Sequence, residues 1–283
     1  MDRLFAGLSL ESSSKYRSGT VFSQCKLVVL VSTRQIYWLD NALQNRRLLR
    51  MSEDLTPYLQ PSLTVNSDHP EVTARADALT DPSASPTDNA LTLYYWVRDA
   101  IRYNPYSLDL SPAGLSASTV LASRNGWCVP KAALLAALCR HAGIPARLGF
   151  ADVRNHLSTQ RMRDTMKTDL FYFHGYTSIY LEGKWVKATP AFNIELCDKF
   201  GLKPLEFNGR DDSLYHEFDQ AGNKHMEYVR DRGEHVDIPI EEMTAVFRKY
   251  YPQMTHLGED HTTSLGDEQQ WEHDIAVEAA REA

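Results

Sequence analysis

The sequence predicts an α+β fold in which a buried central helix packs on an antiparallel sheet. The helix is indicated by an alanine- and leucine-rich run over residues 131–143, which is apolar on nearly every face. The sheet is indicated by residues 170–181, an alternating aromatic and β-branched stretch. A second strand over residues 184–188 follows after a two-residue turn. A strong helix former next to a hairpin of strands is typical of the mixed class.

The beginning of the chain differs in charge from the rest. Residues 1–50 contain 8 Lys and Arg against 3 Asp and Glu, whereas the remaining residues contain 22 against 34. We expect residues 1–50 to be an N-terminal extension; the alternative is an ordinary subdomain whose strand is residues 26–32. The main domain is expected over residues 51–253.

Two shorter helices are expected before the central one. The first lies near residues 71–79, and the second begins after a cap at Thr87 or Asp88. The second helix ends before Pro105, because proline cannot continue the hydrogen-bond ladder. A loop over residues 107–118, rich in Ser, Pro and Gly, then leads to the central helix.

The C-terminal segment is acidic. Residues 255–283 hold 8 Asp and Glu and a single basic residue. We therefore expect residues 254–283 to form a flexible, solvated tail.

Composition excludes several classes of partner. The net charge of −7 and the pI of about 5.8 argue against nucleic acid or an anionic membrane. No apolar run approaches the roughly 18 residues that a membrane-spanning helix needs. There is no secretory signal pattern, and a cytoplasmic location is expected. The four cysteines are widely spaced without a CxxC pair, which is neither a disulfide framework nor a zinc ribbon: Cys25, Cys128, Cys139 and Cys197.

Cys128 is predicted to lie at the N-terminus of the central helix. Pro130 suits the first helical turn, and Gly143 suits the left-handed position after the last turn. Unpaired N–H groups and the helix dipole at such a start stabilise negative charge, which predicts a lowered thiol pKa and a place for an oxyanion. The alternative is a small buried apolar residue, which is the interpretation we give Cys139 in the middle of the helix.

His174 lies on the predicted strand over residues 170–181. With Glu182 and Gly183 as the turn, Tyr176 is expected opposite Thr189. Thr189 then lies diagonally beside His174 on the same face, roughly 7–8 Å away between backbones. A side chain at that position can hold the second nitrogen of the imidazole.

These motifs together resemble the transglutaminase-like superfamily, which has a papain-like Cys-His fold. They are Gly126-Trp127-Cys128 at a helix start, His174 on a strand, and Trp185-Val186 followed by Pro190 on the next strand. The segment Trp96–Tyr103 also resembles the helix that precedes the cysteine in that family. The resemblance covers about residues 90–195, and it implies Cys128 as the nucleophile and His174 as its base.

The third member of the family's catalytic set does not carry over. The family usually has Asp directly before the proline, and this chain has Thr189 there. Threonine can accept a hydrogen bond but cannot stabilise an imidazolium by charge. Asn193 is the candidate substitute, and Asp152 and Asp169 are further alternatives.

The resemblance implies a cysteine-dependent hydrolase or acyltransferase acting on an amide or peptide bond, that is, a cysteine peptidase or amidase or a transglutaminase-like enzyme. The alternative is a catalytically silent binding module. A peptide or other amide-containing substrate is the expected partner, and no cofactor is implied. Trp127, Tyr176 and Arg124 are the residues expected to contact substrate.

Other polar residues have two interpretations. Several histidines and acids could suggest a metal site, but they contain no ligand pair such as HxxxH, so no metal is predicted, and lining of the cleft is the alternative: His216, His225, His235, Asp219 and Glu227. A group of arginines forms either a solvated surface or a site for an anionic substrate group: Arg124, Arg147, Arg154, Arg161 and Arg163.

Overall fold

The computed structural model describes residues 53–155, 158–214, 226–254 and 262–282. The chain divides into two compact units, Met1–Glu53 and Asp54–Ala283, and the second holds every element described below. The expectations for residues 1–50 lie outside the described residues. Within the described part, no helix combines the length and the apolar character needed to cross a membrane.

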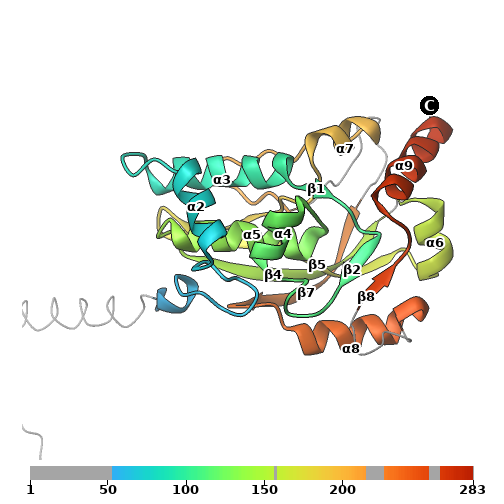
Figure 1. The fold of residues 1–283 in the computed structure, drawn as a ribbon, viewed down its shortest axis with the longest axis horizontal. Coiled ribbons are helices and arrows are strands. Elements are labelled where there is room, and N and C mark those ends of the chain that lie inside the picture. Colours follow the sequence, from blue (N-terminus) through green and yellow to red (C-terminus); the bar gives the residue numbers. More distant parts are fainter. Residues whose placement is uncertain (1–52, 156–157, 215–225, 255–261, 283) are drawn as a thin grey trace, which may run out of the picture. The chain divides into compact units, whose positions relative to one another are not determined.

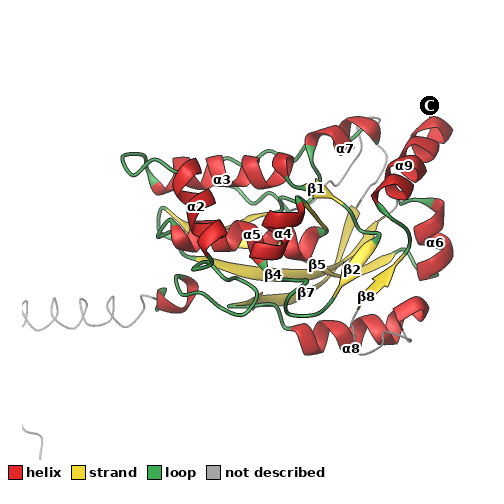
Figure 2. Ribbon diagram, in the orientation of Figure 1, coloured by secondary structure: helices red, strands yellow, loops and turns green. Residues whose placement is uncertain are grey.

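Four antiparallel strands form the main sheet, in the order β6-β5-β4-β7 (Figure 2). They are β4 (Ala146–Asn155), β5 (Leu170–Leu181), β6 (Lys184–Ala188) and β7 (Met226–His235). β4 was not predicted from the sequence. It is buried at almost every position, so it lacks the alternation that marks a strand with one solvated face.

The β5–β6 hairpin has the predicted register. Thr177 pairs with Ala188, and Leu181 pairs with Lys184. The turn residues Glu182 and Gly183 have φ angles of 50° and 87°. Positive φ at both central residues is the geometry of a type I′ turn, whose twist matches that of the flanking strands.

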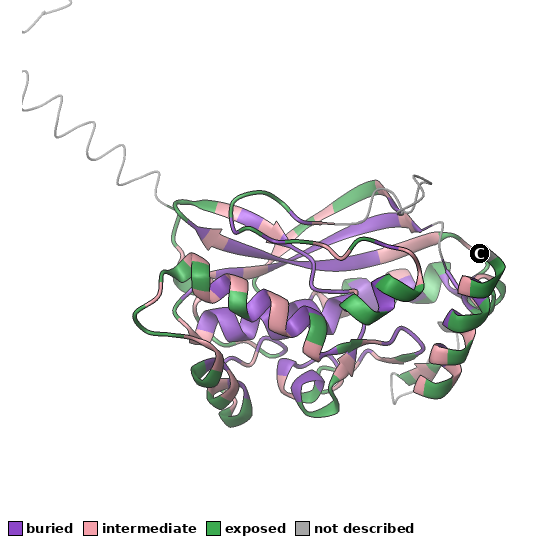
Figure 3. Ribbon diagram, turned by 90° about the horizontal axis from the view of Figure 1, so that it is seen from above, coloured by how far each residue is buried: buried purple, intermediate pink, exposed green. Residues whose placement is uncertain are grey.

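The central helix α5 (Cys128–His141) lies along one face of the sheet (Figure 1). Every residue from Cys128 to Arg140 is buried, and Figure 3 shows the helix buried along most of its length. The helix ends before Gly143, whose φ of 73° is the expected left-handed conformation. The predicted α+β class, with a buried helix on an antiparallel sheet, is confirmed.

Shorter elements surround this core. Two small sheets form, one from the parallel strands β1 (Arg102–Tyr103) and β3 (Asn125–Gly126), the other from the antiparallel strands β2 (Ser107–Asp109) and β8 (Thr262–Ser264). Two 3-10 turns are η1 (Thr56–Tyr58) and η2 (Pro252–Met254). The remaining helices are α2 (Pro70–Leu79), α3 (Pro86–Ala100), α4 (Ala117–Ser123), α6 (Gln160–Met166), α7 (Ile194–Lys199), α8 (Ile240–Tyr250) and α9 (Glu268–Glu282).

The predicted cap of α3 was wrong by two or three residues. Ser85 is the cap, and its hydroxyl accepts a hydrogen bond from the Asp88 N–H at 3.1 Å. Pro86 then occupies the first helical position, where the missing N–H has no cost. The expected loop over residues 107–118 contains β2 and the start of α4.

Lys131 connects α5 to the end of α3. It is fully buried, and its Nζ donates to the backbone oxygens of Arg98, at 3.0 Å, and Ile101. Burial lowers the pKa of this amine to about 7. The contact satisfies carbonyls that the end of α3 leaves without helical partners.

The expectation of a flexible C-terminal tail is wrong for residues 262–282. Trp271 and Ile275 of α9 are buried, and Trp271 Nε1 donates to the backbone oxygen of Tyr103 at 2.8 Å. The side chain of Glu278 accepts a hydrogen bond from the N–H of Gln160. One aromatic and one branched residue four positions apart anchor an otherwise acidic helix. Residues 255–261 lie outside the described part.

α5 lies very close to β5 at Gly175. A Cβ at this position would lie 2.8 Å from Val129 Cα and 3.0 Å from Val129 Cγ2. One turn further along α5, the Thr177 hydroxyl donates to the backbone oxygen of Ala132 at 2.9 Å. Only glycine therefore allows the helix start and the strand to touch.

Gly175→Ala is expected to destabilise the fold by about 1–3 kcal/mol, because the added methyl overpacks a backbone contact. Urea denaturation measures the change in the free energy of unfolding. Gly126→Ala is the matched control, since its Cβ would meet neighbours only at 3.4–3.6 Å. Equal, small losses in both variants would show that the close contact at Gly175 is not limiting.

Candidate active site

Cys128 and His174 line the same cavity. Cys128 begins α5 and is 6% exposed, and His174 lies on β5 and is 7% exposed. The cavity measures about 70 Å³. Its aromatic walls come from Tyr103, Trp127, Phe171, Tyr172, Phe247 and Tyr251.

The surroundings of the Cys128 thiol act on its pKa in opposite directions. Burial raises the pKa to about 11, whereas backbone N–H groups of Gly175, Val129 and Cys128 itself lower it. The sequence predicts a lowered thiol pKa, and this prediction is wrong because desolvation outweighs the N–H groups of the helix start. The thiol is therefore protonated at neutral pH unless a base takes its proton.

A β-bulge lies immediately before His174. Ala151 of β4 pairs with His174. The next pair joins Val153 to Phe171, so two residues of β5 face one residue of β4. One of the two, Phe173, has a φ of 56°, which is uncommon for a large side chain. Bulges of this kind redirect the side chain that follows them and occur often next to active sites.

Asp152, the single residue facing the bulge, holds it in place. Its Oδ1 accepts a hydrogen bond from the Phe173 N–H at 3.2 Å. Both carboxylate oxygens bind Arg232, at 2.5 and 2.9 Å, and both side chains are 5% exposed. The guanidinium also lies 4.3 Å from the centroid of the Phe173 ring. Asp152 and Arg232 thus fix the strand geometry that presents His174.

Residues 73–190 match the Transglutaminase-like superfamily. This part of the chain is similar to that superfamily. The matched segment contains both Cys128 and His174 and ends at Pro190, the proline of the motif.

Two solved structures show limited similarity to this chain. A "putative cysteine protease" from Cytophaga hutchinsonii has a TM-score of 0.40 and 20% sequence identity, over 66% of this chain and 56% of that protein. A "putative protease" from Parabacteroides distasonis has a TM-score of 0.30 and 18% identity, over 44% of this chain and 25% of that one. This chain thus spans little more than half of the first protein. No curated protein matches it.

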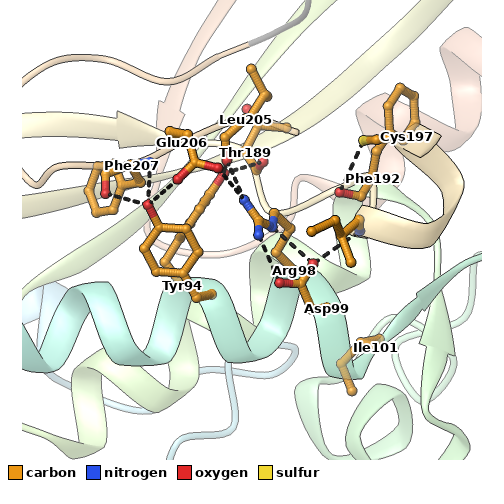
Figure 4. A network of polar contacts seen from close by, with 12 residues as sticks. Tyr94, Arg98, Asp99, Ile101, Thr189, Phe192, Cys197, Leu205, Glu206 and Phe207 are labelled. Carbon is orange, nitrogen blue, oxygen red and sulfur yellow. Dashed lines mark hydrogen bonds and ion pairs between the residues drawn. The ribbon is translucent and has the colours of Figure 1, made fainter. Parts of the chain in front are cut away.

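Thr189 stands where the transglutaminase-like family usually has an acid. It belongs to a network of hydrogen bonds that includes side chains of α3 (Figure 4). Its backbone oxygen accepts from the Tyr94 hydroxyl at 3.3 Å, and its N–H donates to the backbone oxygen of Ser213 at 2.9 Å. Its own hydroxyl is buried, with no hydrogen-bond partner among the described residues. Arg98 and Asp99 complete the network on the same helix.

Asn193 is bonded to a wall of the cavity. Its Oδ1 accepts a hydrogen bond from the Tyr103 N–H at 3.1 Å. The Tyr103 ring lines the cavity beside Cys128 and contacts Phe192 with 4.7 Å between ring centroids. This contact gives Asn193 a structural function in holding the wall. Asp169, the other alternative acid, pairs with Arg154 at the surface.

The three residues expected to contact substrate occupy different places. Trp127 lines the cavity, with its ring centroid 6.0 Å from that of Phe247. Tyr176 is buried against Gly149 and is not among the residues of the cavity walls. Arg124 is exposed and lies over the ring of Trp96, outside the cavity.

The arginines expected to recognise an anion are mostly paired with acids. Arg147 pairs with Glu234, Arg161 with Asp274 and Arg163 with Glu278. Among the described residues, no group of three or more His, Cys, Asp and Glu side chains could hold a metal ion. His216, His225 and Asp219 lie outside the described part, and His235 and Glu227 lie on β7.

Sequence reasoning missed the walls that come from distant segments. Phe247 of α8 and Tyr251 just after it reach the cavity, and the Tyr251 hydroxyl accepts from the Tyr172 N–H at 2.8 Å. Met162 and Met166 of α6 add two flexible side chains. The helical spacing of Met243, Phe247 and Tyr251 signals an amphipathic helix, but nothing local says what it covers.

Asp152→Asn is expected to destabilise the protein by about 3–5 kcal/mol, because it leaves the buried Arg232 without its carboxylate. Urea denaturation measures the loss. Asp169→Asn is the matched control: its partner Arg154 is 38% exposed and Asp169 itself 54% exposed, so we expect less than about 1 kcal/mol. Equally small losses would show that the ion pair does not hold the bulge.

Proposed function

We propose that the chain is a Cys-His thiol hydrolase that cleaves an amide or ester bond through a thioester at Cys128. The observation that supports this most directly is that Cys128, at a helix start, and His174, on the neighbouring strand, line one cavity. The match of residues 73–190 to the transglutaminase-like superfamily agrees with it. The substrate is a peptide or another amide-containing molecule.

In the proposed reaction His174 takes the proton of the Cys128 thiol, and the thiolate attacks the carbonyl carbon of the substrate. The N–H groups at the start of α5 stabilise the oxyanion that forms. His174 then gives the proton to the leaving amine, and a thioester remains on Cys128. Water resolves the thioester in a hydrolase, whereas a primary amine would resolve it in an acyltransferase. Hydrolysis is the simpler outcome, because water needs no second binding site.

A catalytically silent binding module is the second candidate. It is favoured by Thr189, a buried neutral residue where the family usually has an acid. A neutral partner cannot stabilise the imidazolium by charge, and loss of an orienting acid can lower turnover by about 10⁴ where one is needed. In this alternative the cavity binds its ligand without reaction.

The pH dependence of Cys128 alkylation separates the two candidates. With a pKa of about 11, an unassisted thiol is roughly 10⁻⁴ ionised at pH 7, and its labelling should rise about tenfold per pH unit towards pH 11. If His174 takes the proton, wild-type labelling by iodoacetamide should level off well below pH 9. The His174→Ala variant should show only the steep high-pH rise.

Mass spectrometry assigns the label to each cysteine. Cys139 and Cys197 are buried with a pKa of about 12 and serve as internal references that stay slow. Identical, slow profiles in wild type and His174→Ala would exclude the enzyme and support the binding module.

A further inference from the structure

The walls of the cavity beside Cys128 are mainly apolar and aromatic, and the polar side chains among them are Asn155, His174, Gln253 and Thr263. None of the described side chains that line it is Asp, Glu, Lys or Arg. Besides the aromatic rings, the walls include Leu108, Val153, Met162, Met166 and Leu265. We propose that the acyl group transferred to Cys128 carries an uncharged, apolar side chain that binds in this cavity; this inference rests on the proposed function.

Two tyrosine hydroxyls of the walls are already bonded to the protein, whereas the buried Gln253 Oε1 has no hydrogen-bond partner among the described residues. The Tyr251 hydroxyl accepts from the Tyr172 N–H and donates to the backbone oxygen of Leu170 at 3.2 Å. The Tyr106 hydroxyl bonds Thr159 at 2.6 Å and donates to Asp274 at 2.8 Å. These rings therefore present their carbon faces to a ligand.

Charged side chains on α6, next to these walls, are paired with acids of α9. Arg161 binds Asp274 at 2.7 Å, and Arg163 binds Glu278 at 3.2 Å, both between α6 and α9. An ionic substrate side chain would have to enter the cavity without an Asp, Glu, Lys or Arg side chain of the described lining to pair with. Burying an unpaired charge costs far more than burying an apolar group of the same size, so charged acyl groups are rejected.

Met162 is one of the residues that lie between the two cavities. It is 6% exposed and also lines a second cavity of about 30 Å³, whose described lining again includes no charged side chain. Tyr103 and Phe171 lie in the walls of both cavities. Because methionine is unbranched and adaptable, its movement joins the two spaces and admits a large ring.

Affinity labelling tests this selectivity. N-acetyl chloromethyl ketones of phenylalanine, glutamate and lysine alkylate a thiolate with release of chloride and formation of a thioether. The rate at Cys128, divided by the iodoacetamide rate, is read by mass spectrometry. The phenylalanine reagent should label at least about tenfold faster than the two charged reagents.

Met162→Lys places a cation in the wall, and it should raise the glutamate rate at least about tenfold relative to the phenylalanine rate. Met162→Leu should keep the wild-type order. Thr165→Lys is the matched control, because it adds the same charge to α6 outside both cavities. If Met162→Lys does not fold, the wild-type series and Met162→Leu still decide the question.

Equal rates for the three reagents with normal iodoacetamide labelling would overturn the apolar specificity and leave the Cys-His site standing. Failure of every reagent, iodoacetamide included, would refute the reactive thiol and with it the proposed function.

Discussion

The site depends on the contact between the start of α5 and the middle of β5, where Gly175 lies against Val129. A single methyl group at Gly175 would meet the helix backbone at 2.8 Å, so the absence of a side chain sets the distance between helix and strand. This distance brings the Gly175 N–H to the Cys128 sulfur and places the preceding residue, His174, at the same cavity. It also closes the thiol off from water, which raises the pKa of Cys128 to about 11. The glycine thus allows the close contact between the helix start that carries Cys128 and the strand that carries His174.

The second constraint is the strained backbone before His174. A phenylalanine in the left-handed region costs of order 1–3 kcal/mol, and it persists only where the surroundings determine it. Here Asp152 accepts the Phe173 N–H, and Arg232 holds Asp152 in a bidentate ion pair while packing over the Phe173 ring. A buried pair of this kind is weak evidence for stability but strong evidence for a fixed geometry, because removing either partner strands the other. Asp152 therefore acts by holding the direction of β5 just before His174.

Local signals in the sequence were sufficient for the two elements that carry the catalytic candidates. Pro130 and Gly143 indicated the two ends of α5, and the Glu182-Gly183 turn indicated the register of the β5–β6 hairpin. Local signals were not sufficient for the bulge at Phe173, because this bulge depends on Asp152 of β4 and Arg232 of β7. The walls from α6 and α8 were missed for the same reason, and so was the packing of α9, whose Trp271 donates to the backbone oxygen of Tyr103, 168 residues away. The pKa of Cys128 was mispredicted because a helix start is visible in sequence, whereas the degree of burial is not.

Burial connects the chemistry of the thiol to the choice of substrate. The helix start supplies N–H groups that favour a thiolate, but the apolar walls disfavour it more strongly, so the nucleophile depends on proton transfer to His174 in the proposed reaction. The same walls remove water from around a charged substrate group and offer it no counter-ion. A neutral residue at position 189 is compatible with such a site if the imidazolium is stabilised mainly by the thiolate it has just formed, since attraction between two opposite charges grows as water is excluded. In the proposed reaction the apolar cavity therefore has two effects. It holds the acyl group, and it strengthens the attraction between the Cys128 thiolate and the His174 imidazolium.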